Sequence, residues 1–285
     1  MLGAIIGDIA GSRFEGRRRN RKSVEFTFFH HRSCLTDDTV MTAAVAQAIV
    51  AAEGDYSKLG SLTVASLKLF GRKFPLAGYG HLFRNWLASD ETAPYNSYGN
   101  GAAMRVSPCG LAADSLDEAL ELATLVTEVT HNHPEGLKGA QATAAAVYLA
   151  KTGLTLSEIR TYINEKYYKL DFTLEEIRPH YSFDSSCMGS VPQAIEAFLE
   201  SSSYEDAIRK AVSIGGDSDT IAAITGGIAG AFWGVGADFK SQALRILPQE
   251  IKKAIKEFEE RFPPLCCPGI IKALNRLDRD YLGLS

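Results

Sequence analysis

Long segments with apolar residues at helical spacing make up most of the chain. We predict helices in the Ala/Leu/Ile-rich segments at residues 39–52, 116–130, 135–150, 191–200, 204–214, 220–232, 249–261 and 270–281. No run of alternating β-branched residues has a useful length, and residues 24–29 come nearest, as a short extended piece. No linker, low-complexity tract or shift in charge divides the chain. The pattern therefore predicts a single all-α domain over residues 1–285.

Polar residues and prolines mark several of the predicted helix starts. Ser115 with Glu118, and Thr155 with Glu158, have the spacing of capping sequences. A proline fits the first turn of a helix because its missing N–H would have had no partner there. We expect such first-turn positions for Pro134, Pro192 and Pro248.

Residues 221–237 are uncharged and form the one stretch that could be considered as a membrane span. They are rich in Gly and Ala rather than in Leu and Phe, and the stretch is short for a span. We predict a buried helix there.

Two predicted helices carry glycines at every fourth position, namely Gly3, Gly7 and Gly11 in one and Gly226, Gly230 and Gly234 in the other. A glycine inside a helix costs about 1 kcal/mol relative to alanine, so this spacing needs a reason. A stripe without side chains lets two helix backbones approach closely. We hypothesise that these helices pack together at the centre of the bundle and bring Asp8 or Glu15 near Asp217 and Asp219.

The composition is that of an ordinary globular protein, with 46% hydrophobic and 22% charged residues. A net charge of −4 gives no general attraction to nucleic acid or to an anionic membrane. The basic run at residues 17–22 is either a solvated loop or an anion-attracting edge beside an active site.

The cysteines show no CxxC pair and no metal-finger spacing. Their odd number, five, and the early acid in the first eight residues argue against a secretory leader and for reduced thiols. A cytoplasmic location is therefore expected. The cysteines are Cys34, Cys109, Cys187, Cys266 and Cys267.

Two acidic motifs, Thr-Asp-Asp-Thr at residues 36–39 and Asp-Ser-Asp-Thr at residues 217–220, each stand at the start of a predicted helix. Asp and Thr are common helix caps, so capping is one interpretation. However, a cap needs one side chain, and each motif offers at least three oxygen-bearing residues. Paired carboxylates at a buried helix start are costly unless a cation neutralises them. We therefore favour divalent metal binding, with Mg²⁺ or Mn²⁺ preferred because the ligands are all oxygen.

Two further segments carry polar groups that could contact a ligand. The Gly-Asn-Gly turn at residues 99–101 could present backbone N–H groups to phosphate oxygens, although such turns are common. His131 and His133 precede Pro134 without a third His or Cys ligand nearby in the sequence. For these histidines we favour a structural role or a polar substrate contact over a transition-metal site.

Together these motifs resemble those of the ADP-ribosylglycohydrolase family. The likeness runs along nearly the whole chain in the family's order, through Gly7-Asp8-Ile9-Ala10-Gly11 with Glu15, the Thr36–Thr39 motif, Gly99-Asn100-Gly101 to Met104-Arg105, Thr130-His131 with Pro134, Ser190-Val191-Pro192-Gln193-Ala194, and Gly216 to Thr220. The two acidic motifs in this order are the most specific part of it.

The resemblance implies a compact multi-helix orthogonal bundle that binds two Mg²⁺ ions, or Mn²⁺, and hydrolyses the bond between ribose C1″ of ADP-ribose and an acceptor. It implies metal ligands at Thr36, Asp37, Asp38, Asp217, Asp219 and Thr220. It implies substrate contacts at Ser97, Tyr98, Gly99, Asn100, Gly101 and His131. The carboxylate that takes a proton from water would be Asp37, Asp217 or Glu15. Asp8 is left open between a structural and a catalytic role.

Two other functions fit the same residues. A two-metal phosphoesterase would use a similar centre, and a non-catalytic ADP-ribose-binding protein would use the same cleft. For a hydrolase, the partner would be an ADP-ribosylated protein or a small ADP-riboside, with no membrane, and with nucleic acid only as an ADP-ribosylated substrate. The acceptor, arginine, serine or another group, would be selected by the irregular segments at residues 17–31, 76–98 and 172–188.

Overall fold

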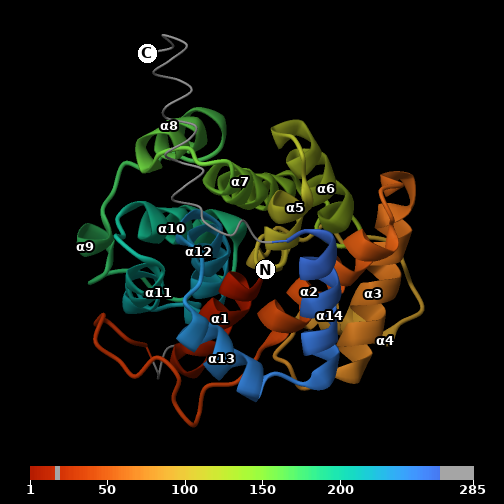
Figure 1. Cartoon of the computed structure of the whole chain (residues 1–285), viewed down its shortest axis with the longest axis horizontal. Helices are drawn as coiled ribbons and strands as arrows, with labels where there is room; N and C mark the ends of the chain where they lie inside the picture. Colours follow the sequence, from red (N-terminus) through yellow and green to blue (C-terminus); the bar gives the residue numbers. More distant parts are fainter. Residues whose placement is uncertain (17–19, 264–285) are drawn as a thin grey trace.

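The regular secondary structure is helical throughout the part of the chain that the computed structural model describes, residues 1–16 and 20–263 (Figure 1). Within these ranges there is no β-strand, and a single bridge pairs Gly99 with Ser186. Residues 24–29 form bends rather than the extended piece expected from their sequence. The predicted all-α class is confirmed.

The α-helices are α1 (Leu2–Gly11), α2 (Asp37–Ala51), α3 (Leu59–Lys73), α4 (His81–Ala88), α5 (Ser107–Ala112), α6 (Leu116–Glu128), α7 (Pro134–Lys151), α8 (Leu156–Lys166), α9 (Leu174–Ile177), α10 (Cys187–Leu199), α11 (Tyr204–Ser213), α12 (Ser218–Trp233), α13 (Ala237–Ile246) and α14 (Gln249–Arg261). Short 3₁₀ helices span Ser12–Phe14 (η1), Tyr56–Lys58 (η2) and Asn100–Ala102 (η3).

Most of the predicted segments lie on observed helices. The prediction for residues 249–261 coincides with α14, and α12 begins two residues before the predicted start at residue 220. The helix predicted at residues 270–281 lies outside the described residues, as do Cys266 and Cys267. Helix α4 lies inside the segment at residues 76–98 that was expected to be irregular.

The helix starts agree with the sequence in part. Ser115 accepts from the Glu118 amide, and Thr155 with Glu158 forms a complete capping box. Pro134 is the first residue of α7, as expected. The other two prolines do not lie in first turns: Pro248 is the N-cap residue of α14, and Pro192 lies inside α10.

Pro192 was misplaced because α10 begins earlier than the apolar pattern indicates. Its start is fixed by Ser186, whose hydroxyl accepts from the Gly189 amide at 3.1 Å. Pro192 is therefore the sixth residue of the helix, where a proline removes one interior hydrogen bond.

Helices α1 and α12 run antiparallel, with their backbones in direct contact along the glycine stripe of α1. A Cβ built on Gly3 would lie 3.2 Å from the Gly230 Cα. One built on Gly11, at the other end of α1, would lie 2.7 Å from the Asp219 Cα. The predicted close packing is confirmed, except at Gly234, which ends α12 with φ 76° and does not face α1.

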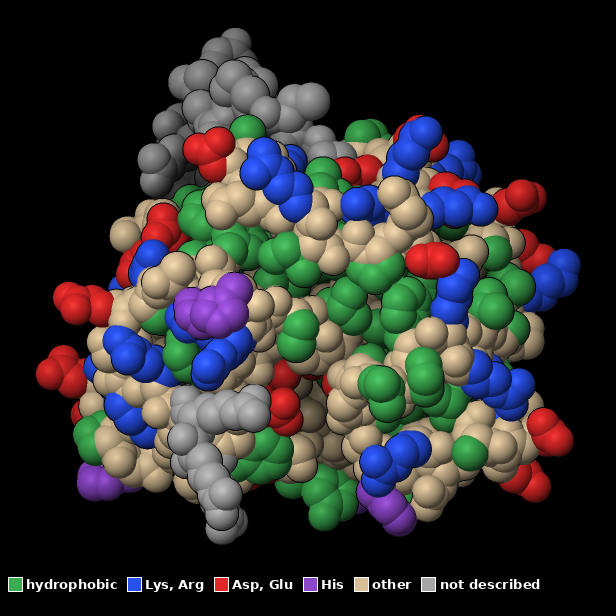
Figure 2. All heavy atoms as spheres, turned by 90° about the horizontal axis from the view of Figure 1, so that it is seen from below, with side chains coloured by type: hydrophobic (Ala, Val, Ile, Leu, Met, Phe, Trp, Pro, Cys, Tyr) green, Lys and Arg blue, Asp and Glu red, His purple; other side chains and the backbone are tan. Residues whose placement is uncertain are grey.

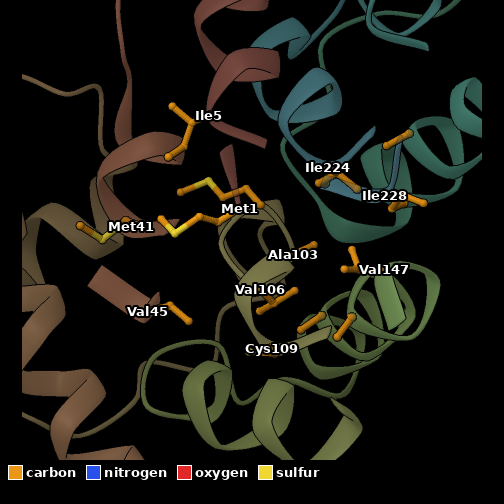
Figure 3. Close-up of a cluster of buried hydrophobic side chains, with 14 of the residues drawn as sticks. Met1, Ile5, Met41, Val45, Ala103, Val106, Cys109, Val147, Ile224 and Ile228 are labelled. Carbon is orange, nitrogen blue, oxygen red and sulfur yellow. The ribbon is translucent and has the colours of Figure 1, made fainter. Parts of the chain in front are cut away.

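A hydrophobic core surrounds this central pair. In Figure 3, side chains from α1, α2, α5, α7 and α12 meet in one cluster, as seen for Ile5, Met41, Cys109, Val147 and Ile224. Each of these side chains is at most 1% exposed. Helix α14 packs across α2 on the outside (Figure 1).

Helix α12 is buried along almost its whole length, as predicted, but it ends at Trp233, and residues 236–237 of the predicted stretch are exposed. Across the described residues, no helix has both the length and the apolar character that spanning a membrane would require.

Candidate active site

The α1–α12 packing brings both acidic motifs to one cavity. Helix α2 begins at Asp37 and α12 begins at Ser218, so both motifs stand at helix N-termini. A cavity of about 300 Å³ lies over them. It opens on the face shown in Figure 2, which is hollowed near its centre and shows acidic side chains in the hollow. The hypothesis that distant helix ends meet at Asp217 and Asp219 is thus confirmed in its geometry.

Asp38, one of the carboxylates at this cavity, has an oxygen without a hydrogen-bond partner. Its side chain is buried, and Oδ2 accepts from the hydroxyls of Thr36 and Thr220, each at 3.2 Å. Oδ1 is fully buried and has no hydrogen-bond partner within residues 1–16 and 20–263. A buried carboxylate oxygen left unpaired is costly, and a bound cation would remove that cost.

Two overlapping sets of three carboxylates can each enclose a cation. Oxygens of Asp8, Asp38 and Asp219 lie within 4.8 Å of one another, and so do oxygens of Glu15, Asp217 and Asp219. Asp219 belongs to both sets. Because every donor is a carboxylate oxygen, the chemistry fits Mg²⁺ or Mn²⁺ better than Zn²⁺.

The carboxylates raise one another's pKa values. Burial is the main cause, and the neighbouring acids add to it, so that the pKa of Asp37 reaches about 8. Burial and adjacent carboxylates also hold the pKa values of Asp38 and Asp219 well above their usual range. Burial raises the pKa of Asp217, although a hydrogen bond from Asn100 opposes the shift. The fully ionised cluster is therefore unfavourable until a cation compensates its charge.

Helix capping explains one of the acidic motifs in part. Thr36 is the N-cap of α2, and its hydroxyl accepts from the Asp38 amide at 3.3 Å. Asp217 occupies the equivalent position before α12, but its carboxylate makes no capping bond. It instead accepts from the side chain of Asn100. Capping therefore does not account for Asp217.

Asn100 connects the Gly-Asn-Gly turn to the acidic cluster. Its Nδ2 donates to Asp217 Oδ2 at 2.7 Å and to Ser190 Oγ at 2.9 Å. Its backbone amide donates to the Ser185 carbonyl at 2.8 Å. The side chain thus orients a carboxylate as well as lining the cavity.

His131 faces the same turn from the other side. Its Nδ1 lies 2.8 Å from the Thr130 hydroxyl, which also accepts from Arg105 Nη2 at 2.7 Å. Its Nε2 lies 3.1 Å from the point where a Cβ on Gly101 would stand. Burial and the nearby Arg105 hold the pKa of His131 well below its usual range, so the ring stays neutral.

Nearly all the predicted site residues line this one cavity. Those that do are Glu15, Asp37, Asp38, Asp217, Asp219, Thr220, Ser97, Gly99, Asn100, Gly101 and His131. Two do not. Thr36 lies behind Asp38 and donates to Asp8 Oδ1 at 2.7 Å, and Tyr98 is 51% exposed, with its ring 5.3 Å from that of His133.

Other residues at the site were assigned no definite role from the sequence. Asp8 was left open, yet it belongs to one of the carboxylate sets. The sequence signal that Asp8 lies at the site was its position between Gly7 and Gly11, because this glycine stripe faces α12. The cavity is also lined by Met41, Leu82, Phe83, Tyr95, Arg105 and Phe183. Arg105 belongs to the motif at residues 99–105, and the others belong to no motif.

The chain is similar to known proteins in sequence and in fold. Residues 1–268 match the model of the ADP-ribosylglycohydrolase family. ADP-ribosylhydrolase ARH3 of Bos taurus is 28% identical over 314 residues, covering 82% of this chain and 84% of the relative. ADP-ribosylarginine hydrolase Tri1 of Pseudomonas putida is 26% identical over 295 residues, covering 92% and 77%. A solved structure described as an ADP-ribosylglycohydrolase-related protein complex superposes with a TM-score of 0.68 at 22% identity, covering 93% of this chain and 96% of that one.

Proposed function

The chain belongs to the ADP-ribosylglycohydrolase family, and from this we propose that it releases ADP-ribose from an ADP-ribosylated acceptor by hydrolysis at C1″, using two Mg²⁺ ions or Mn²⁺. The membership itself supports hydrolysis of ADP-ribose glycosidic bonds. The metal dependence, the residue roles and the acceptor are the parts that we add.

The observation that carries the proposal is the arrangement of Asp38, Asp217 and Asp219 at the cavity. Asp219 is shared by two carboxylate sets, and Asp38 Oδ1 is buried without a partner. A centre with two adjacent cation positions suits a substrate that offers two neighbouring hydroxyls, as the ribose next to C1″ does.

We propose that both motifs hold the metals through Thr36, Asp37, Asp38, Asp217, Asp219 and Thr220, with Asp8 and Glu15 adjoining them. When bound, the cations would polarise the ribose hydroxyls and lower the pKa of a water molecule. Thr36 would act from the side of Asp38 that faces away from the cavity, because its hydroxyl contacts both Asp8 and Asp38.

The opposite wall of the cavity would bind the rest of ADP-ribose. Two amides of the turn are already used, since the Gly99 amide donates to Ser97 Oγ at 3.1 Å and the Asn100 amide donates to Ser185. We therefore assign contacts with the diphosphate and distal ribose mainly to the Ser97 hydroxyl, Gly101 and His131 Nε2. Tyr98 would contribute only at the edge, because half of its side chain is exposed.

The reaction breaks the bond through an oxocarbenium-like transition state. One carboxylate among Asp37, Asp217 and Glu15 would accept the proton of the attacking water, and the acceptor would leave with one proton as its bond to C1″ breaks. Asp217 has one oxygen bonded to Asn100 at 2.7 Å, which fixes the orientation of its carboxylate. The surrounding negative charge would stabilise positive charge developing at C1″.

The acceptor requires a direct assay. The protein should be incubated with ADP-ribosyl-arginine, ADP-ribosyl-serine and free ADP-ribose, each with Mg²⁺, with Mn²⁺ and with EDTA. Release of ADP-ribose that requires the cation supports the proposal and identifies the acceptor. Formation of AMP would support a phosphoesterase instead, and tight ADP-ribose binding without turnover would support a binding protein.

A matched pair of variants separates the site from general effects. We expect Asp37→Asn, at the cavity, to lower turnover by about a thousandfold, within the range seen when a group at a metal centre is removed. Asp171→Asn makes the same chemical change on an exposed loop residue and should leave turnover unchanged. Equal activity of both variants would contradict the assignment of the site.

A further inference from the structure

Asp8 lies at the contact between α1 and α12 and is fully buried. Its neighbours Gly7 and Gly11 rest against the backbone of α12, at Ala222 and at Asp219. This packing leaves the Asp8 carboxylate no access to solvent and fixes its position relative to Asp219. The position is thus set by the backbone contact rather than by flexible side chains.

The Asp8 carboxylate accepts hydrogen bonds from four donors, all on one turn. Oδ2 accepts from the Thr36 amide at 2.9 Å, from the Thr39 amide at 3.1 Å and from the Thr39 hydroxyl. Oδ1 accepts from the Thr36 hydroxyl at 2.7 Å. A carboxylate offers about four lone-pair positions, so these donors use most of its capacity.

These bonds complete the first turn of α2, which carries Asp37 and Asp38. A helix start leaves its first backbone N–H groups without intrahelical partners. Here the Asp37 amide donates to the Ala77 carbonyl at 2.7 Å and the Asp38 amide to the Thr36 hydroxyl. The Thr39 amide donates to Asp8, which therefore supplies the last of these partners from another helix.

We propose that Asp8 is a positioning residue: it holds the turn at residues 36–39 so that the unpaired Asp38 Oδ1 is directed at the cation site shared with Asp219. This rests on the proposed function, since it assumes that the carboxylate cluster binds a divalent cation. Asp8 acts on the cation through Thr36 and Thr39, because its own oxygens are already engaged. Asp38 differs from Asp8, because its Oδ1 accepts no hydrogen bond within the described residues.

Direct ligation by Asp8 is the competing role, because one of its oxygens lies within 4.8 Å of oxygens of Asp38 and Asp219. Thr39 distinguishes the two roles. It contacts Asp8, is fully buried, and is not one of the proposed ligands. Removing its hydroxyl disturbs positioning by Asp8 but leaves both Asp8 oxygens in place as possible ligands.

The test measures the affinity of the metal-free protein for Mg²⁺ and Mn²⁺ by titration calorimetry, together with its melting temperature. We expect Asp8→Asn and Thr39→Val each to raise Kd by about ten- to a hundredfold, as changes behind a metal ligand do. Thr39→Ser retains a hydroxyl and should restore the affinity. Thr63→Val, at a buried threonine of α3 whose hydroxyl has no partner, is the matched control and should bind metal like the wild type.

Each other outcome overturns a defined part of the inference. Wild-type affinity in Thr39→Val with weak binding in Asp8→Asn would make Asp8 a ligand. A lower melting temperature with unchanged Kd in both variants would show a merely structural residue. If the wild type binds neither cation, the proposed metal centre fails and the positioning role fails with it. If Asp8→Asn does not fold, Thr39→Val still decides between the roles.

Discussion

Gly7 in α1 packs directly on the backbone of Ala222 in α12. A Cβ added to Gly7 would lie 2.5 Å from the Ala222 carbonyl carbon, closer than any relaxed contact. The neighbouring residue, Asp8, holds the first turn of α2. The N-terminal end of α12, which carries Asp219, packs against Gly11 of the same glycine stripe. The approach of these two helices therefore determines how the acidic motifs meet.

We expect Gly7→Ala to destabilise the protein strongly, because the added methyl group must push two backbones apart. Overpacking of this kind costs about 1–3 kcal/mol or more. Gly60→Ala, in α3, is the matched control: its Cβ would meet nothing closer than 3.8 Å, and alanine favours the helix by about 1 kcal/mol. Urea denaturation should show a lower free energy of unfolding for Gly7→Ala and a higher one for Gly60→Ala, each relative to the wild type. A neutral Gly7→Ala would mean that the helices can separate without cost.

Asp219→Asn should affect activity and stability in opposite directions. Turnover should fall by about a thousandfold, because Asp219 belongs to both carboxylate sets. In EDTA, the same variant should melt at a higher temperature than the wild type, because a buried carboxylate beside Asp217 and Asp38 has been neutralised. Thermal melts with EDTA and with Mg²⁺ check both effects. A variant that is less stable in both conditions would indicate that Asp219 mainly stabilises the fold.

The metal-free protein should lose stability as the pH rises from about 4 to 8. The pKa of Asp37 is about 8 in the folded protein, against about 3.9 in an unfolded chain. The folded state therefore holds more protons in this interval, and stability must fall with pH. Asp8, whose pKa is raised by burial to about 6, contributes with the same sign.

Saturating Mg²⁺ should flatten this pH dependence, because binding requires ionised carboxylates and releases their protons. Asp37→Asn should reduce the slope in EDTA. Melting temperatures measured across this interval, with and without cation, provide the comparison. A metal-free protein whose stability rises with pH would contradict the electrostatics of the cluster.

Asn100→Ala should lower turnover by about ten- to a hundredfold, with little change in melting temperature. The variant removes the 2.7 Å bond that orients Asp217, as expected for a partner of a metal ligand. Ser190→Ala removes only the second contact of the same amide, at 2.9 Å, and should have a smaller effect. Equal effects of both variants would assign Asn100 a packing role.

The sequence was informative where its signal was local and repeated. The stripe of Gly3, Gly7 and Gly11 predicted close packing correctly, because nothing but backbone contact explains glycines at that spacing in a helix. The bounds of α14 followed from its periodicity. Helix α4 was missed, because an eight-residue helix gives little more than two turns of pattern.

What the sequence could not supply were the contacts between distant residues. Asn100 was predicted to contact substrate, and its bond to Asp217, 117 residues away, has no local signature. Asp8 has four donors in the turn at residues 36–39 that only the folded chain brings to it. The roles of the site residues, the single domain and the cytoplasmic location remain predictions.

The contact between α1 and α12 also constrains the order of folding. The Tyr204 hydroxyl donates to the Gly3 carbonyl across 201 residues of sequence, and the glycine stripe meets residues still further along the chain. Contacts of such long range form late and slow folding, because closure of a long loop must come first. During synthesis, α1 emerges first but lacks its main packing partner until α12 leaves the ribosome. The acidic cluster is thus assembled only on a nearly finished chain, so an incomplete product would have no working site.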